Sequence, residues 1–146
     1  MLIRHAAESD AAQIAGLLPD LGYVGDASDV QRRMKRLTNY PDNALFVAVI
    51  DNSLVGLCHA QGTPLLATDG YSEIQALVVS NQFQRRGIGR ELVAAAVNWS
   101  VGLGYTRVRL RSGLHRTEAH LFYEGIGFKR SKPSYAFERV IQKHAA

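Results

Sequence analysis

Residues 84–89 read QRRGIG, Gln84-Arg85-Arg86-Gly87-Ile88-Gly89, and they stand between an apolar run and a long amphipathic segment. The apolar run ends at Val79, and apolar side chains then repeat at helical spacing from residue 88 to residue 101. The stretch is therefore predicted to join a strand to the start of a helix. The positive end of the helix dipole disfavours cations there. Arginines at 85, 86 and 90 consequently indicate that an anion binds at this turn.

The glycines of this turn suit it to holding phosphate groups. Gly87 and Gly89 let the backbone approach an anion closely, and the first amides of a helix lack helical partners. Two phosphate motifs do not fit: a P-loop needs Gly-Lys-Ser/Thr where the chain has Gly89-Arg90-Glu91, and the dinucleotide fingerprint needs glycine where the chain has Leu92. The alternative interpretation is a connecting turn with solvated arginines.

Composition bounds the class of protein. The chain has 146 residues with 47% hydrophobic content, which fits one domain, residues 1–146. Its apolar runs are far shorter than the ~20 residues of a membrane helix, and no signal-peptide core follows Met1, so we expect a cytoplasmic protein without a membrane partner. The single cysteine, Cys58, excludes an internal disulfide and a cysteine zinc site. It is expected to be a small buried side chain.

The positive charge is distributed in a way that disfavours nucleic acid as a partner. The net charge is +4, and the arginines form three groups, within 32–36, 85–90 and 107–111. There is no basic tail and no interleaving of basic with aromatic residues. A small polyanionic ligand is the favoured partner. No metal is expected, because no second histidine stands three or four residues from His120.

The remaining segments show an alternation of strand and helix patterns. A tight hairpin is predicted at residues 51–53. Strands are expected at 1–4, 45–50, 54–60, 72–79 and 106–111, with a closing pair at Phe128 and 135–140. Helices are expected from Ser9 or Asp10 to Leu18 and at 29–37, 87–101 and 117–124. This order predicts a mixed α/β fold in which a meander precedes β-α-β crossovers.

Three motifs in this order resemble the GCN5-related N-acetyltransferase (GNAT) family. QRRGIG matches the family's acetyl-coenzyme A pyrophosphate pattern, Gln/Arg-x-x-Gly-x-Gly/Ala. Residues 73–79 (EIQALVV) resemble the strand before it, and residues 119–128 (AHLFYEGIGF) match the closing Ala-x-x-x-Tyr-x-x-x-Gly-Phe signature. The resemblance implies a central mixed sheet of about six to seven strands, splayed by a bulge between strands 4 and 5 and flanked by about four helices.

The resemblance implies that acetyl-coenzyme A is the donor. The backbone of Leu77, Val78 and Val79 would pair with the pantetheine amides in the gap beside the splayed strand. Arg116 is a further cofactor-binding position, where this chain departs from the asparagine of the commonest family pattern. The residues that would hold the pyrophosphate are Gln84, Arg85, Arg86, Gly87, Ile88, Gly89 and Arg90.

The implied reaction is the direct attack of a neutral amine on a thioester. Glu73 occupies the place where many family members have a carboxylate that takes the amine proton, directly or through water. Tyr123 matches the tyrosine that protonates the departing thiolate and also contacts the cofactor. The alternatives are an exposed strand-end carboxylate for Glu73 and core packing for Tyr123.

The acceptor is expected to be a primary amine of a small molecule. Residues 116–123 (RTEAHLFY) resemble a branch that includes aminoalkylphosphonate acetyltransferases. Tyr23, Asp26 and His120 are candidate acceptor contacts, with solvated or capping roles as their alternatives. A protein or peptide N-acetyltransferase and a non-catalytic acyl-coenzyme A sensor are the other functions considered. Dimerisation is common in the family, but no sequence feature decides whether this chain is a homodimer.

Overall fold

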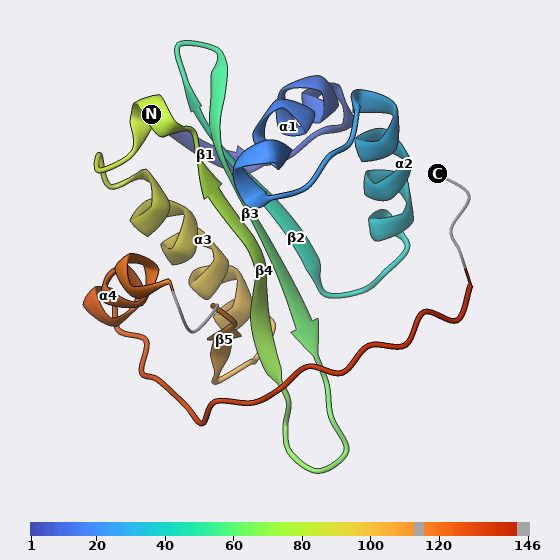
Figure 1. The fold of residues 1–146 in the computed structure, drawn as a ribbon, viewed down its shortest axis with the longest axis vertical. Coiled ribbons are helices and arrows are strands. Elements are labelled where there is room, and N and C mark those ends of the chain that lie inside the picture. Colours follow the sequence, from blue (N-terminus) through green and yellow to red (C-terminus); the bar gives the residue numbers. More distant parts are fainter. Residues whose placement is uncertain (113–115, 143–146) are drawn as a thin grey trace. The chain divides into compact units, whose positions relative to one another are not determined.

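A computed structural model describes residues 1–112 and 116–142 (Figure 1). The chain divides into two compact units, Met1–Arg111 and the residues from Ser112 onward. The first unit holds a five-stranded sheet, and the second holds helix α4 (Thr117–Gly125). The elements of the first unit are β1 (Leu2–His5), α1 (Ala11–Leu17), α2 (Ala27–Thr38), β2 (Asn43–Ile50), β3 (Ser53–Thr63), β4 (Tyr71–Val79), α3 (Ile88–Gly102) and β5 (Val108–Leu110).

The sheet has the strand order β1-β2-β3-β4-β5. The first four strands pair in antiparallel fashion, and β5 pairs with β4 in parallel. Asp51 and Asn52 join β2 to β3 with φ values of 49° and 63°. Positive φ at both central residues matches the right-handed strand twist, which confirms the predicted hairpin.

A bulge interrupts β4 in its middle. His59 pairs with Ala76 and Ala60 pairs with Ile74, so Gln75 is an extra residue on β4. On the other side, β5 pairs only with Ser72–Ile74, whereas β4 continues to Val79. Within residues 1–111, the second half of β4 therefore has no strand beside it on the β5 side. This is the splayed arrangement that the resemblance implied.

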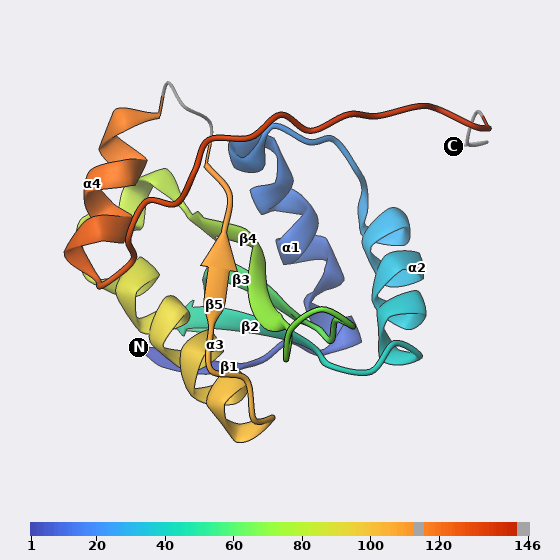
Figure 2. The same cartoon turned by 90° about the horizontal axis from the view of Figure 1, so that it is seen from below.

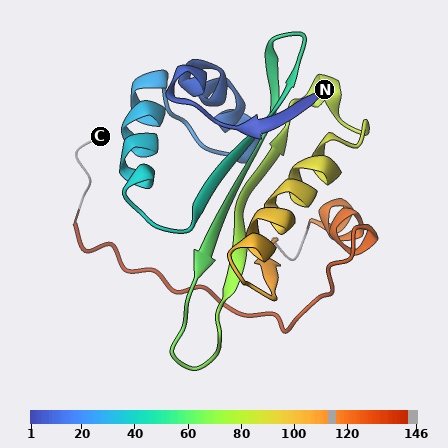
Figure 3. The same ribbon diagram turned by 180° about the vertical axis from the view of Figure 1, so that it is seen from behind.

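The two faces of the sheet are covered by different helices. Figure 2 shows α3 on one side and α1 with α2 on the other, and Figure 3 shows the same arrangement from behind. Val47, Leu57 and Val78 pack in one cluster with Ile14 of α1 and Met34 of α2. This cluster forms because residues in register on neighbouring strands share one face.

Helix α3 is fixed by a buried stripe at every fourth residue. Ile88, Leu92, Ala96 and Ser100 are all at most 2% exposed. Ser100 Oγ lies 2.7 Å from both the Ala96 carbonyl oxygen and Ser72 Oγ. It can donate to the carbonyl and accept from Ser72, so both buried hydroxyls are satisfied. At the other end of the stripe, Ile88 and Leu92 lie beside Gly56 of β3, so the start of α3, which overlaps the end of QRRGIG, is held against the sheet.

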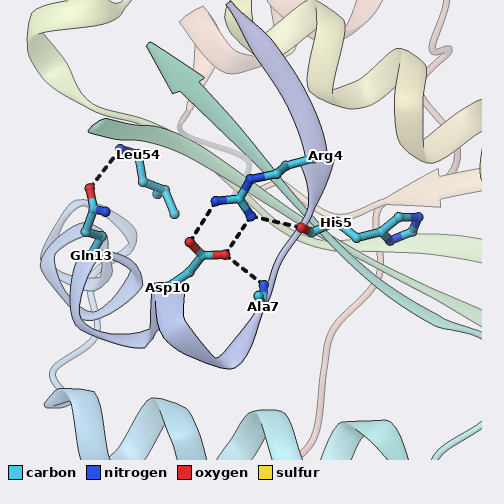
Figure 4. A network of polar contacts seen from close by, with 6 residues as sticks. All are labelled: Arg4, His5, Ala7, Asp10, Gln13 and Leu54. Atoms are coloured by element: carbon cyan, nitrogen blue, oxygen red, sulfur yellow. Dashed lines mark hydrogen bonds and ion pairs between the residues drawn. The ribbon is translucent and has the colours of Figure 1, made fainter. Parts of the chain in front are cut away.

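A second polar anchor ties β1 to the start of α1 (Figure 4). Arg4 donates to both carboxylate oxygens of Asp10, at 2.8 and 2.9 Å, and the Ala7 amide donates to the same carboxylate at 2.7 Å. The Asp10 side chain is buried. The Arg4 hydrogen bonds lower the pKa of Asp10, against the effect of burial. Nearby, Gln13 of α1 accepts from the Leu54 amide of β3 at 2.8 Å.

The closing pair of strands is not formed. No strand is present among residues 126–142, so the described sheet has five strands rather than six to seven. Tyr135, Phe137 and Val140 are 90%, 96% and 73% exposed. A strand needs a backbone partner, and no described strand pairs with this segment, so its alternating pattern alone does not make it a strand. In the described part of the chain, no helix is long and apolar enough to cross a membrane.

We expect Leu92→Ala to lower the free energy of unfolding by about 2–5 kcal/mol, because it leaves a cavity under a fully buried side chain. Urea unfolding followed by circular dichroism measures this change. The matched control is Val101→Ala on the same helix, because Val101 is 65% exposed. Equal losses for the two variants would contradict the packing described for α3.

The lowered pKa of Asp10 predicts a specific pH dependence of stability. The contribution of Asp10 is complete above the ordinary carboxyl pKa of 3.8 and is lost as the pH falls through the lower pKa of the folded state. Urea midpoints of the wild type should therefore fall more steeply below pH 3.8 than those of Asp10→Asn. Parallel pH profiles would show that the ion pair with Arg4 does not contribute to the acid sensitivity.

Candidate functional site

The turn between β4 and α3 leaves backbone amides available to a ligand. A short 3-10 helix, Asn81–Phe83, precedes it, and Arg85 and Gly87 have φ values of 63° and 79°. The Glu91 amide bonds to the Gly87 carbonyl, and no side chain caps the helix. The amides ahead of Glu91 in α3 therefore lack helical acceptors, at the positive end of a 15-residue helix.

The arginines of this turn are exposed and unneutralised. Arg85, Arg86 and Arg90 make no ion pair within residues 1–112 and 116–142. The Arg86 guanidinium lies 5.0 Å from the centre of the Phe83 ring, which holds it beside the turn. The side chain of Ile88 is buried and anchors α3, and its backbone amide stays a predicted contact of the cofactor. The turn can offer charge and backbone donors to one anion.

Gln84 fastens the turn to the end of the strand. Its side-chain amide donates to the Val79 carbonyl at 3.2 Å and to Asn81 Oδ1 at 3.1 Å. The sequence predicts a contact of Gln84 with the ligand, and the structure gives it an intramolecular role in shaping the turn. Asn81, the partner in this arrangement, was not identified from the sequence because a short polar turn gives no signal of side-chain pairing.

The open edge of β4 leads into this turn. Val78 is buried, with 7% exposure, in the cluster under α1 and α2, and Leu77 and Val79 are half-buried. The side chains are thus used for packing, while the backbone beyond the bulge has no strand neighbour on the β5 side within residues 1–111. An extended chain with amide groups could pair there as an added strand.

Glu73 is a sheltered carboxylate next to the bulge. Its side chain is 14% exposed, so the alternative of an exposed strand-end acid is not supported. Gln75 donates to Oε2 at 3.1 Å. Arg111 Nε lies 3.5 Å from Oε1, close enough for an ion pair, yet the buried Oε1 accepts no hydrogen bond from a described residue. This oxygen has the free acceptor capacity that a general base requires.

Further basic side chains surround Glu73. Arg109 of β5 is in register with Glu73, and its guanidinium lies 4.4 Å from the centre of the Tyr71 ring. On the opposite side, Gln61 of β3 is paired with Glu73. Residues directly paired across strands present their side chains on the same face. Ser72, the strand neighbour of Glu73, faces α3 through Ser100, so Glu73 and Gln61 lie on the opposite face, which α1 and α2 cover.

The structure has a pocket on that face that the sequence does not predict. It has a volume of about 380 Å³ and is lined by Arg33, Arg36, Leu37, Tyr40 and Gln61. Four of these residues come from α2 and the segment after it, and the fifth comes from β3. The available signal was the pair of arginines three positions apart, which fall on one side of a helix. Nothing in the sequence indicated that Gln61 would meet them.

The second unit contains the predicted tyrosine. Tyr123 of α4 is half-buried, with its ring 5.3 Å from that of Phe122 and 6.1 Å from that of Phe128. Arg116 stands just before the helix, and its carbonyl accepts from the His120 amide at 3.1 Å. These residues belong to one unit, and Glu73 and the turn belong to the other. The catalytic pairing of Tyr123 with Glu73 stays a prediction.

The predicted acceptor contacts before α2 have different environments. Tyr23 is 66% exposed. Asp26 is the N-cap of α2: it accepts from the Asp29 amide at 2.9 Å, and Asp29 accepts from the Asp26 amide at 3.1 Å. This reciprocal pair is a capping box, so Asp26 has a structural role that accounts for it without a ligand. Its role in binding the acceptor stays a prediction.

The buried titratable groups near the centre of the sheet are not arranged for chemistry. Burial raises the pKa of Cys58 to about 12 and lowers the pKa of His59. His59 Nε2 lies 2.9 Å from Asn43 Oδ1, where the ring nitrogen is the donor. Among residues 1–112 and 116–142, no three His, Cys, Asp or Glu side chains gather as a metal site would require.

Comparison with known proteins identifies the family. Residues 15–128 match the model of the acetyltransferase (GNAT) family. The chain belongs to this family. An aminoglycoside N(6')-acetyltransferase type 1 from Stenotrophomonas maltophilia is 26% identical over an alignment of 151 positions, which covers 98% of this chain and 95% of that protein. An N-acetylaspartate synthetase from Xenopus tropicalis is 25% identical over 104 residues, 71% of this chain. The GNAT chain spans only 36% of that synthetase.

Solved structures show the same fold. The aminoglycoside acetyltransferase AAC(6')-Iy, in complex with a bisubstrate analogue of coenzyme A, superimposes with a TM-score of 0.85. The match covers 95% of this GNAT chain and 97% of the other at 16% identity. The mixed α/β class predicted from the sequence is therefore confirmed, with five described strands in place of the expected six to seven.

We expect the thiol of Cys58 to resist modification in the folded protein. The side chain is fully buried, and a pKa of about 12 leaves almost no thiolate at neutral pH. Reaction with a chromogenic disulfide reagent should be slow without denaturant and rapid and stoichiometric in guanidinium. Fast labelling of the native protein would contradict both the burial and the conclusion that Cys58 takes no part in chemistry.

Proposed function

We propose that this chain is an acetyl-coenzyme A-dependent N-acetyltransferase that transfers an acetyl group to a primary amine of a small molecule. The observation that carries the proposal is the open edge of β4 beyond Gln75, which runs directly into a helix start with available amides. An extended arm that carries amide groups can pair with an open strand edge, and a pyrophosphate can bind the amides at a helix start. Coenzyme A has such an arm followed by a pyrophosphate, in the same order as the open edge and the helix start. Family membership and the names of the relatives support the same donor and the same class of acceptor. We further propose that residues 1–146 form one catalytic domain.

In this proposal, the backbone of Leu77–Val79 binds the pantetheine amides. The turn amides, with Arg85, Arg86 and Arg90, hold the pyrophosphate. Gln84 keeps the turn in shape, through its bonds to Val79 and Asn81, rather than supplying charge. Arg116 is a proposed additional contact. Acetyl-coenzyme A supplies an activated acetyl group as a thioester.

The proposed reaction forms one bond and breaks one. The amine nitrogen attacks the thioester carbonyl carbon, a C–N bond forms, the C–S bond breaks, and the thiolate leaves. Glu73 takes the proton that the amine must lose, directly or through water; its buried Oε1 has capacity to accept it. Tyr123 is proposed to donate a proton to the thiolate. No covalent enzyme intermediate is required, in line with the unreactive environment of Cys58.

The activity is tested by measuring free thiol release from acetyl-coenzyme A in the presence of a panel of amines and peptides. We expect turnover with small primary amines and little with peptides. Preferential acetylation of peptides would instead support a protein N-acetyltransferase. Tight donor binding by calorimetry with no turnover on any acceptor would support an acyl-coenzyme A sensor and overturn the proposal.

The roles of the two proposed catalytic residues are tested by substitution. Tyr123→Phe should lower kcat by about 10- to 100-fold with little change in donor affinity, because only the acidic proton is lost. Glu73→Gln should lower kcat/KM by about 100-fold or more. Tyr135→Phe is the matched control, since Tyr135 is 90% exposed. An unchanged kcat in Tyr123→Phe would remove this residue from the acid role.

A further inference from the structure

The pocket beside α2 has two arginines in its lining and opens toward solvent. Arg33 and Arg36 line it together with Leu37, Tyr40 and Gln61, in a volume of about 380 Å³. Within residues 1–112 and 116–142, neither arginine forms an ion pair. The carboxylate nearest in charge to Arg33 is Asp29, which accepts hydrogen bonds from the Asp26 amide and from Arg32. The bond from the Asp26 amide is the largest cause of the lowered pKa of Asp29, and the charge of Arg33 adds to it. The charge of Arg36 is left uncompensated.

The strand register links this pocket to the proposed base. Gln61 lines the pocket and is paired with Glu73, so their side chains share a face with Cβ atoms about 5 Å apart. The face therefore presents arginines, then an amide, then a carboxylate. Beyond Glu73 lie the guanidinium groups of Arg109 and Arg111. A ligand that spans from the pocket to Glu73 meets positive charge at one end and a carboxylate at the other.

We propose that the acceptor amine carries an oxyanion, a carboxylate or a phosphonate or phosphate, a few carbons from its nitrogen. Arg36 and Arg33 bind the oxyanion, Gln61 donates an amide hydrogen to it, and Glu73 receives the amine. This inference rests on the proposed function and names the substrate class of that same site. Guanidinium groups match planar and tetrahedral oxyanions through paired donors. The pocket volume is at the small end of ligand sites, which suits a molecule of amino-acid size.

The same charges disfavour a polycationic acceptor. An aminosugar with several protonated amines would place positive charge next to Arg33, Arg36, Arg109 and Arg111, with Glu73 as the opposing carboxylate. The acceptor named for the Stenotrophomonas maltophilia relative is an aminoglycoside. Because of the arginines in its pocket, this chain is proposed to use a different class of acceptor from that relative, although the two share a fold.

The test uses primary amines that differ only in their terminal group. Carboxylate, phosphonate, neutral carboxamide and ammonium ends are each supplied with one to four carbons between the amine and the terminal group. We expect one of the two acids to have a kcat/KM at least 10-fold above the carboxamide of the same length, and the diamine to be poorest. The better acid identifies which oxyanion the pocket prefers. Calorimetric binding of the same amines to the donor-loaded protein gives a readout that does not need turnover.

Variants locate the effect in the pocket. Arg36→Gln should lower kcat/KM for the preferred acid by about 10- to 100-fold and change the value for the matching carboxamide less than about 2-fold. Arg33→Gln should have a smaller effect because Asp29 lies close to Arg33. Arg36→Glu should reverse the preference toward the diamine. Lys35→Gln, on the same helix but outside the pocket lining, is the control for a general loss of charge.

The outcomes separate this inference from the proposed function. Acetylation of amines with no preference for the acids, or equal losses for Arg36→Gln on acid and carboxamide, overturns the inference and leaves the proposed function standing. Donor binding without turnover of any amine overturns the proposed function. In that case, binding of the acidic amines to the wild type that is lost in the Arg36→Gln variant would still support an oxyanion site in the pocket. If the wild type does not bind the acidic amines, the inference is overturned.

Discussion

The limited pairing between β4 and β5 is the constraint on which the rest of this structure depends. Parallel pairing stops at Ile74, and the next residue on β4 is the bulged Gln75. A bulge bends its strand and increases the local twist, so β4 diverges from its neighbour beyond this point. An unpaired strand edge is ordinarily a hazard for a folded protein. Here the edge leads into the turn at residues 84–89, and under the proposed function it pairs with the amide-bearing arm of the donor.

The open edge is tolerable because the other parts of β4 are firmly held. Its side chains pack on both faces: Val78 lies in the cluster with α1 and α2, and Ser72 contacts Ser100 of α3. Binding that uses the backbone therefore does not compete with core packing. The buried side chains of Ile88 and Leu92 fix the position of the N-terminus of α3, so the amides of the turn are oriented before any ligand arrives. Preorganisation of this kind comes from the buried stripe of α3 rather than from the turn itself.

The sequence predicted the features that depend on local patterns. The spacing from Ile88 to Val101 predicts α3, and residues 51–53 predict a hairpin, because periodicity and turn chemistry are local properties. The bulge at Gln75 was expected only through a family resemblance. Alternation in residues 72–79 does not reveal which residue lacks a partner on the neighbouring strand, since register is decided by pairs far apart in the sequence.

The features of the fold and of the site that the sequence does not predict depend on contacts between distant parts of the chain. The pattern at residues 135–140 predicted a strand, but pattern cannot supply a backbone partner. Asp26 stays a predicted acceptor contact, and the spacing of Asp26 and Asp29 also fits the capping box that forms. The pocket was missed because Arg36 and Gln61 come together only when α2 packs over the end of β3. Long-range juxtaposition is the part of the site that sequence patterns do not carry.

The two proposed anion sites account for the basic composition in a way that bulk charge could not. The turn at residues 84–89 meets an anion with backbone amides and the dipole of α3, whereas the pocket beside α2 meets one with guanidinium groups. Backbone amides at a helix start have fixed positions, so they suit the pyrophosphate, which is the same in every molecule of the proposed donor. Flexible guanidinium side chains are replaceable one at a time, which suits the part of a site that discriminates between acceptors. Under the proposed function, the net charge of +4 therefore reflects two small anions that meet in one reaction, not one extended polyanion.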